Sequence, residues 1–308
     1  MYISLSQPYS FTQQGQRSNQ EDSRYPDKDM PDVDQAFFLV CDGVGGCEAG
    51  EVASMSVCRG FAQALRQVDF SEPFTAGDFS SALSAAYDSL DHAAHEVGNS
   101  DMATTLTFVC FHAGGCTMAH IGDSRIYQLR PTEGIVYRSD DHSQLNSFVH
   151  SGLVSPDSTA TDPSRSVISR YMGPQTDEEP RHMATIFETT DVQADDYFFL
   201  CSDGVLDRVD ERKLMQIVFS KDTDEEKCRQ IADMSRNSID NNTAFLLHVA
   251  EVDRSDDDAE EADEAEEYVE HDTVQNRRPY ALAEDVEAGQ PEESLTDRIV
   301  NFFKNLIN

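Results

Sequence analysis

Short apolar runs that end in glycine, aspartate or asparagine recur along the first 250 residues of the chain. Runs of this kind, about four to eight residues long, are typical of buried β-strands. The pattern predicts strands at Ala36–Cys41, Thr105–Phe111, Cys116–Ile121, Arg125–Leu129, Tyr197–Cys201 and Thr243–Val249. The stretch Ala113-Gly114-Gly115 separates the second and third of these strands and predicts a hairpin connection.

Apolar residues recur at intervals of three and four positions in other stretches, which predicts amphipathic helices. These helices are expected at Ala49–Val68, Phe79–Val97, Glu211–Phe219 and Asp224–Ser238. The first two follow one another with no strand between them, whereas several strands are neighbours joined by short turns. This order predicts an α+β domain in which helices cover the faces of antiparallel sheets, rather than alternating βαβ units.

The composition changes at Glu251, where acidic residues begin to dominate. Residues 251–293 contain 18 acidic residues against three arginines. A segment with so much charge cannot bury enough apolar surface to offset the entropy lost on ordering. We therefore expect a globular domain over residues 1–250 and a disordered acidic linker over residues 251–293.

Residues 294–308 are apolar and periodic again, and they predict an amphipathic C-terminal helix. One face of this helix carries Leu295, Ile299, Phe302, Phe303 and Leu306. A helix of about fifteen residues is marginal on its own, so the apolar face needs a surface to pack on. The preferred interpretation is a tethered helix that docks on a protein partner or on its own domain. An ordinary terminal helix packed on the core is the alternative, and membrane docking is less favoured because positive charge is scarce.

The net charge of −35 at pH 7 narrows the classes of partner. Such a charge disfavours binding to nucleic acid and to anionic membrane surfaces. No apolar run approaches the roughly 18 residues that a membrane span needs, and no apolar signal segment opens the chain. The seven cysteines include no CxxC pair and lie mostly in apolar runs, which predicts core residues in a reducing compartment. We therefore expect a cytoplasmic protein.

Two of the predicted strands end in the same Asp-Gly pair, at Asp42 in FFLVCDGVGG and at Asp203 in FFLCSDGV. Other acidic residues near strand ends or the N-terminus are Asp123, Asp240, Glu21 and Asp22. A single aspartate at a strand end is usually part of a turn or a helix cap. Several in one domain indicate a shared role for their carboxylates.

A cluster of carboxylates is costly unless a cation compensates the repulsion between them. A set of oxygen donors favours Mg²⁺ or Mn²⁺, and no spacing of histidine and cysteine typical of zinc is present. Gly43 has no side chain to obstruct the approach of its carbonyl group to an ion. Two such ions would activate a water molecule and clamp a phosphoryl group, which Arg17 is suitably placed in sequence to bind.

The chain resembles the metal-dependent PP2C (PPM) family of serine/threonine protein phosphatases, in its bacterial form, over roughly residues 8–250. The motifs that carry the resemblance, in family order, are RSNQED (Arg17–Asp22), CDGVGGCEAGEVAS (Cys41–Ser54), MATTLTFVCF (Met102–Phe111), IGDSRIYQL (Ile121–Leu129), DDHSQ (Asp140–Gln144), SGLVSPD (Ser151–Asp157), SRSVISRYMG (Ser164–Gly173), FFLCSDGVLD (Phe198–Asp207) and SIDNNTAFLLHV (Ser238–Val249). Each motif alone is weak, but their order and spacing together are specific.

The resemblance implies a four-layer α-β-β-α sandwich of two antiparallel sheets flanked by helices, with metals at one end. It implies hydrolysis of phosphoserine and phosphothreonine in proteins by a metal-activated water, with Mn²⁺ or Mg²⁺ as cofactor and a serine/threonine kinase as the opposing enzyme. By this resemblance, Asp42 bridges two metals, Gly43 ligates one of them through its carbonyl, and Asp203 and Asp240 complete the site of the other. Glu21 and Asp22 hold metal-bound waters, and Asp123 binds a third and looser metal together with Asp203. Arg17 contacts the substrate phosphate.

The source of the proton for the leaving group is left open by the sequence. Val44 stands where animal members of the family often have a histidine, a proposed general acid. His142 in the DDHSQ motif is a candidate, although packing or capping of a helix that starts at Asp140-Asp141 is the favoured interpretation. His120 lies within a predicted strand and is expected to be structural.

The choice of substrate is also left open. In the flap-like stretch over residues 146–173, Asp162-Pro163 replaces the His-Pro of many relatives. Arg165 and Arg170 are suited to an anionic ligand, but each is equally suited to pairing with nearby acids. Two other functions compete with a protein phosphatase: a scaffold that binds phosphoproteins without hydrolysis, and a phosphatase of a small metabolite. The carboxylates favour an enzyme, because a scaffold has no chemical need for six acids that repel one another.

Overall fold

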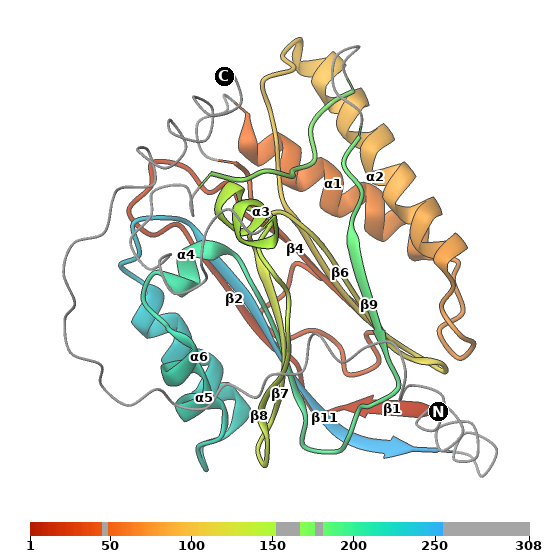
Figure 1. Ribbon diagram of the computed structural model, residues 1–308, viewed down its shortest axis with the longest axis vertical. Helices are drawn as coiled ribbons and strands as arrows, with labels where there is room; N and C mark the ends of the chain where they lie inside the picture. Colours follow the sequence, from red (N-terminus) through yellow and green to blue (C-terminus); the bar gives the residue numbers. More distant parts are fainter. Residues whose placement is uncertain (45–48, 152–166, 176–180, 255–308) are drawn as a thin grey trace, which may run out of the picture.

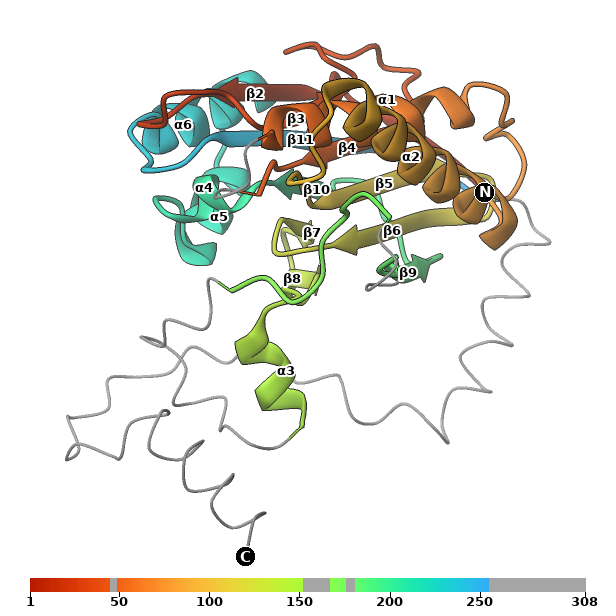
Figure 2. The same cartoon turned by 90° about the horizontal axis from the view of Figure 1, so that it is seen from above.

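Two antiparallel sheets form the centre of the computed structural model, which describes residues 1–44, 49–151, 167–175 and 181–254 (Figures 1 and 2). One sheet has six strands in the order β1-β11-β10-β7-β8, with β2 also paired to β11. Its strands are β1 (Tyr2–Leu5), β2 (Tyr9–Gln13), β7 (Arg125–Arg130), β8 (Gly134–Arg138), β10 (Tyr197–Cys201) and β11 (Asn242–Asp253). The long strand β11 pairs with β2 along its first half and with β1 along its second half.

The second sheet has five strands in the order β3-β4-β5-β6-β9. Its strands are β3 (Ser23–Tyr25), β4 (Phe37–Cys41), β5 (Leu106–His112), β6 (Gly115–Ile121) and β9 (Thr185–Thr189). Every residue of β4, β5 and β6 is buried, because helices cover one face of this sheet and the other sheet covers the opposite face. This double burial explains why apolar residues point to both faces of these strands and why the polar residues among them, Thr107, His112, Thr117 and His120, are buried as well.

Helices complete the outer layers. The helices α1 (Gly50–Leu65) and α2 (Ala76–Val97) cover the five-stranded sheet, and α4 (Asp203–Leu206), α5 (Glu211–Val218) and α6 (Asp224–Ser235) cover the six-stranded one (Figure 1). The short helix α3 (Gln144–His150) projects from the sandwich (Figure 2). Thr75 and Thr223 begin α2 and α6 with capping boxes, in which the threonine and the acid three residues on satisfy each other's backbone N–H groups.

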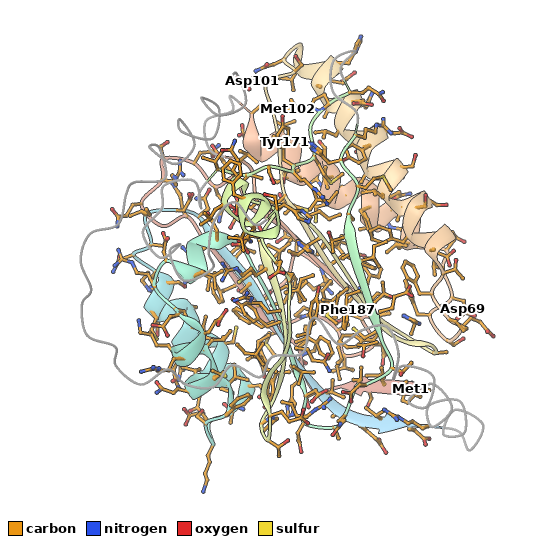
Figure 3. All side chains as sticks on the ribbon, in the orientation of Figure 1. Met1, Asp69, Asp101, Met102, Tyr171 and Phe187 are labelled. Atoms are coloured by element: carbon orange, nitrogen blue, oxygen red, sulfur yellow. The ribbon has the colours of Figure 1, made fainter. Side chains whose placement is uncertain are left out.

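Side chains fill the spaces between the four layers (Figure 3), and the buried apolar ones form three clusters. One lies between the α1–α2 pair and the five-stranded sheet and includes Phe61 and Phe108. One lies between the sheets and includes Phe38 and Phe245, whose rings pack edge to face with their centroids 5.3 Å apart. The third lies under α4, α5 and α6. The expected four-layer α-β-β-α sandwich is therefore confirmed.

The predicted strands are all present, and their ends shift by at most four residues. The sequence reading missed β1, β2, β3, β8 and β9, which are short or carry few buried residues. The helix expected at Asp140-Asp141 begins instead at Gln144, because residues 142–144 pair with residues 167–169. Strand β11 passes the expected boundary at residue 250 and ends at Asp253. Residues 251–253 of the expected linker are therefore part of β11, because they pair with β1, and the rest of the linker and the C-terminal helix lie beyond the described residues.

The six cysteines among the described residues are buried and free of disulfides. Within the same residues, the longest helices are too short or too polar to cross a bilayer.

Candidate metal and phosphate site

The ends of strands from both sheets bring the predicted acidic residues to one edge of the sandwich. Asp42 directly follows β4, and Asp203 follows β10 at the start of α4. Asp123 lies in the turn between β6 and β7, and Asp240 lies just before β11. Asp22 immediately precedes β3, so all five carboxylates are held by the ends of regular elements.

The backbone of Asp42 is fixed by two threonines that directly precede β5. The Asp42 N–H donates to the hydroxyl of Thr105, and the Thr105 N–H donates to the Asp42 carbonyl at 2.8 Å. The hydroxyl of Thr104 donates to the same carbonyl at 2.8 Å, and the Thr105 hydroxyl is also bonded to that of Ser124. These side chains, which the sequence reading missed, tie the strand end that carries Asp42 to the turn that carries Asp123.

Gly43 occupies a position that no other residue could take. Its N–H donates to the Glu21 carbonyl at 3.2 Å, and it forms a β-bridge with Thr104. A Cβ atom added here would lie 2.6 Å from the carbonyl oxygen of Gly50 and 2.8 Å from that of Glu21. The three backbone segments therefore approach one another only because the side chain is absent.

Asp22 is the most enclosed carboxylate of the group, with 7% of its surface exposed. Its Oδ2 accepts a hydrogen bond from the Ser202 hydroxyl at 2.8 Å. Its Oδ1 is buried and has no hydrogen-bond partner among the described residues. A buried carboxylate oxygen without a partner is costly, so this atom is suited to a cation or to a water held by one.

The carboxylates disfavour one another's ionisation. Burial, followed by repulsion from Asp22, Asp203 and Asp123, raises the pKa of Asp42 well above its ordinary value. Burial raises the pKa of Asp22 and of Asp123 to about 7. The side chain of Asp203 is exposed, yet desolvation by the surrounding protein and repulsion from Asp240 raise its pKa to about 6. A cation placed among these groups would relieve the repulsion that these shifts reflect.

Arg17 lies beside the carboxylates and forms an ion pair with Asp240. The side chain of Arg17 is 46% exposed, so the guanidinium remains accessible from solvent. Asn241 holds this region together, since its side chain accepts from the Glu21 N–H and donates to the carbonyls of Gln14 and Asn19. The sequence reading missed Asn241, whose only signal was its position next to Asp240.

The donor set fits a divalent cation in its chemistry: several carboxylates, a glycine carbonyl and a partnerless Asp22 oxygen lie at one edge. In the part of the chain that the structure describes, no three His, Cys, Asp and Glu side chains are already arranged around one point as metal ligands. Ligation by three or more of these side chains therefore requires the carboxylates to move toward the ion.

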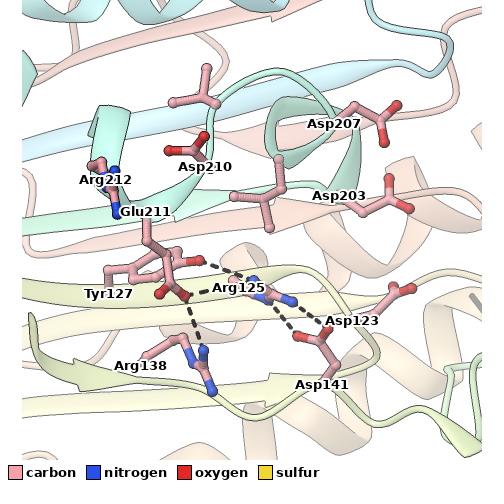
Figure 4. A pocket seen from close by; sticks show the side chains of 12 residues that line it. Asp123, Arg125, Tyr127, Arg138, Asp141, Asp203, Asp207, Asp210, Glu211 and Arg212 are labelled. Carbon is pink, nitrogen blue, oxygen red and sulfur yellow. Dashed lines mark hydrogen bonds and ion pairs between the residues drawn. The ribbon is translucent and has the colours of Figure 1, made fainter. Parts of the chain in front are cut away.

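A cavity of about 740 Å³ opens beside Asp123 and Asp203, and Figure 4 shows its lining. Arg125 lies in it and makes a two-point ion pair with Asp141, at 2.6 and 2.7 Å. Arg138 in turn donates to Glu211 at 3.0 Å. The charges of these two arginines are already balanced by Asp141 and Glu211. They therefore do not neutralise the carboxylates of Asp123 and Asp203 in the cavity wall.

The other residues singled out from the sequence fall into three groups. The ring of His120 is buried in β6 and bonds the Asp140 carbonyl at 2.8 Å, consistent with a structural role. The ring of His142 has a hydrogen-bond partner at each nitrogen. Arg170 is exposed, whereas Asp162-Pro163 and Arg165 lie outside the described residues.

The family model described as "Protein phosphatase 2C" matches residues 20–237. The chain is 32% identical over 243 residues to the serine/threonine protein phosphatase PstP of Mycobacterium tuberculosis, which covers 77% of this chain and 43% of that protein. It is 28% identical over 245 residues to the protein phosphatase PhpP of Streptococcus pneumoniae, which covers 77% of this chain and 94% of the relative.

Solved structures agree with these matches. The crystal structure of Stp1 from Staphylococcus aureus, a serine/threonine phosphatase, superposes with a TM-score of 0.68 at 26% identity and covers 82% of this chain and 98% of that one. The catalytic domain of PstP, solved in complex with two manganese ions, superposes with a TM-score of 0.62 at 26% identity and covers 81% of this chain and all of that one.

Proposed function

Because this chain belongs to the protein phosphatase 2C family, we propose that it is a metal-dependent hydrolase that removes phosphate from phosphoserine and phosphothreonine in proteins. One observation carries the proposal. Strand ends from two sheets bring Asp22, Asp42, Asp123 and Asp203 so close that each opposes the ionisation of another. Such repulsion destabilises the fold unless a bound cation compensates the charges, which indicates a functional site.

The proposed ligands follow the resemblance residue by residue. Asp42 and the Gly43 carbonyl, with Asp203 and Asp240, would hold two divalent cations, and Asp123 with Asp203 a third. Glu21 and Asp22 would act through water. When bound, the cations supply an activated water nucleophile and neutralise the charge of the phosphoryl group. Oxygen donors support Mn²⁺ or Mg²⁺, and the two manganese ions in the PstP structure support Mn²⁺.

Arg17 is proposed to bind the substrate phosphate. A guanidinium donates two parallel hydrogen bonds to a phosphate, and Arg17 is both accessible and adjacent to the carboxylate cluster. Its present partner, Asp240, is itself a proposed metal ligand. Phosphate binding and cation binding at Asp240 would therefore favour each other, because each draws one member of the pair away from the other.

His142 does not act as the general acid in this proposal. Burial, followed by the nearby His120, Arg170 and His182, lowers its pKa to about 3, so its ring is neutral at physiological pH. Both ring nitrogens are also engaged with protein atoms. The one N–H of a neutral imidazole is far too weak an acid to protonate a leaving serine or threonine, and here it is bonded to Thr185.

The wider setting of the enzyme belongs to the same proposal. We expect a serine/threonine kinase to supply the phosphorylated substrate and the cytoplasm to be its location. Residues 255–293 would form the acidic linker, and residues 294–308 a helix that docks on a protein partner or on the domain. The proposed boundary moves to residue 254, because β11 extends to Asp253.

One experiment tests the main proposal. The purified full chain is assayed with Mn²⁺ on p-nitrophenyl phosphate, a phosphothreonine peptide and sugar phosphates, with Asp203→Asn as the inactive reference. We expect Mn²⁺-dependent turnover of the first two substrates. Binding of the phosphopeptide without turnover would favour the scaffold, and preferential turnover of a sugar phosphate would favour a metabolite phosphatase.

A further inference from the structure

His142 holds both backbone groups of a single residue, Gly122. The His142 N–H donates to the Gly122 carbonyl at 2.9 Å. The Gly122 N–H donates in return to His142 Nδ1 at 3.1 Å. The peptide planes on both sides of Gly122 are therefore set by one histidine that lies 20 residues away in the sequence.

The orientation of Gly122 decides where the next side chain points. Gly122 has a φ of +109°, and a Cβ there would lie 2.6 Å from the Cγ2 of Thr105, so no other residue could take its place. The next residue is Asp123, which is 9% exposed and lines the cavity. A rotation of the peptide on either side of Gly122 would thus move the Asp123 carboxylate within the wall.

The second ring nitrogen fixes the tautomer of His142. Nε2 lies 2.9 Å from the Thr185 hydroxyl on β9. Since Nδ1 accepts the Gly122 N–H, the ring proton is on Nε2 and points to Thr185. The ring also stacks on His120, with centroids 4.3 Å apart and planes at 18°. Two hydrogen bonds and one stacking contact leave the ring a single orientation.

The backbone around His142 holds the segment that follows residue 166. The Ser169 N–H donates to the His142 carbonyl at 2.7 Å, and the Gln144 N–H donates to the Val167 carbonyl at 2.9 Å. Further along this segment, Met172 exchanges two hydrogen bonds with Thr104, which in turn bridges Gly43. His142 is thus the point at which this segment, the Asp123 turn and β9 are joined.

We infer that His142 is a positioning residue, which aims the Asp123 carboxylate into the cavity through its Nδ1 hydrogen bond to Gly122. The inference rests on the proposed function only in assigning a cation to Asp123. The ring does not touch substrate. Its part is to fix the peptide between Ile121 and Gly122, and with it the backbone that leads to Asp123, so that the oxygen atoms of Asp123 are already oriented toward a bound cation.

Three substitutions separate this role from simple packing. In His142→Asn, the side-chain oxygen takes the place of Nδ1 and still accepts the Gly122 N–H, but it does not reach Thr185. In His142→Gln, the longer side chain reaches Thr185 and leaves Gly122 without its acceptor. Thr185→Val removes the other partner and serves as the matched control. The two His142 variants carry the same kind of amide group, so a general effect of polarity is shared by both.

The measurement is Mn²⁺ binding to each full-length protein by calorimetry, with Asp123→Asn identifying the binding step that depends on Asp123. We expect His142→Gln to weaken that step about 5- to 10-fold, the size expected for one buried hydrogen bond, and to leave the tighter steps unchanged. His142→Asn and Thr185→Val should stay within about twofold of wild type. The effect of His142→Gln should vanish in the double variant with Asp123→Asn.

Equal weakening in His142→Asn and His142→Gln would overturn the inference, and so would a larger effect of Thr185→Val. An undiminished effect of His142→Gln in the absence of the Asp123 carboxylate would do the same. Turnover of p-nitrophenyl phosphate is measured in parallel. If the wild-type protein binds Mn²⁺ but hydrolyses no phosphate ester, the proposed function fails, while the comparison of binding still decides the role of His142.

Discussion

The hydroxyl of Ser202, which follows β10 of the six-stranded sheet, donates a hydrogen bond at 2.8 Å to the carboxylate of Asp22, which precedes β3 of the five-stranded sheet. The bond joins the two sheets at the edge where the acidic residues gather. The other oxygen of the same carboxylate is buried and has no hydrogen-bond partner among the described residues. A divalent cation, or a water held by one, would bind this oxygen and strengthen the connection between the sheets.

We expect Asp42→Asn and Asp203→Asn each to lower kcat/KM on p-nitrophenyl phosphate by about 100-fold or more, because each removes a charged ligand of the proposed cations. The melting temperature in EDTA should stay the same or rise, since the repulsion within the cluster falls. Steady-state kinetics at saturating Mn²⁺ and thermal unfolding in EDTA give the two values. Asp32→Asn, at an exposed loop position, is the control. Turnover close to wild type in Asp42→Asn or Asp203→Asn would show that the substituted carboxylate takes no part in the reaction.

Arg17→Ala should raise KM for a phosphothreonine peptide about 10- to 100-fold, with a smaller change in kcat. A charged hydrogen bond that is made alike in the bound substrate and in the transition state contributes mainly to binding. Arg208→Ala removes another exposed arginine and is the matched control. An unchanged KM in Arg17→Ala would place the phosphate elsewhere and leave Arg17 only its ion pair with Asp240.

The contribution of His112 to the stability of the domain should be lost between pH 6.5 and pH 4. Its Nδ1 accepts the N–H groups of Phe74 and Gly114, both at 3.1 Å, and a proton on Nδ1 would break both bonds. Burial lowers the pKa of His112 from 6.5 to about 4. The unfolded chain therefore binds more protons in this interval, so the contribution of His112 is complete above about pH 6.5 and is lost as the pH falls.

Urea unfolding at pH 7.5 and pH 5 measures this contribution. It amounts to about 2 kcal/mol between these two pH values and to about 3 kcal/mol over the whole interval, since one pKa unit corresponds to about 1.4 kcal/mol. His112→Asn keeps an acceptor near the position of Nδ1 and does not titrate, so its unfolding free energy should depend less on pH. His92→Asn, at an exposed position on α2, should retain the pH dependence of wild type. Identical pH dependence in the wild type and in His112→Asn would show that His112 is protonated without cost.

Truncation after Arg254 should leave turnover of p-nitrophenyl phosphate within about twofold of the full chain. It keeps all of β11, and it keeps Arg254, whose guanidinium donates to the carbonyls of Thr190 and Val192. Activity on a phosphoprotein, or binding of a partner, should change if residues 294–308 dock as proposed.

Truncation after Val249 is the contrasting variant. It removes the pairing of residues 251–253 with β1 and should lower the melting temperature. Loss of small-substrate activity on truncation after Arg254 would place the tail in the core.

Elements with two buried faces could be predicted from sequence, because burial on both sides requires an unbroken apolar run. Strand β10 was predicted to the residue for this reason. Strand β9 could not be predicted in the same way, since four of its five residues are exposed and its place is set by pairing with β6. The aspartates stood out because Asp-Gly interrupts an apolar strand. The hydrogen bonds that hold the aspartates could not be predicted, because partners such as Ser202 and Asp22 lie 180 positions apart in the sequence.

Strand β11 is the last strand of the described chain, but it lies inside its sheet, between β10 and the first two strands. Tyr2 pairs with Asp253, so this contact spans nearly the whole domain. As synthesis proceeds from the N-terminus, β1 and β2 have no partner until β11 emerges from the ribosome. Contacts of such long range slow folding and leave early strands exposed to wrong pairings. Asp240 arrives with the same segment, so the nascent chain completes its sheet and its last proposed metal ligand together.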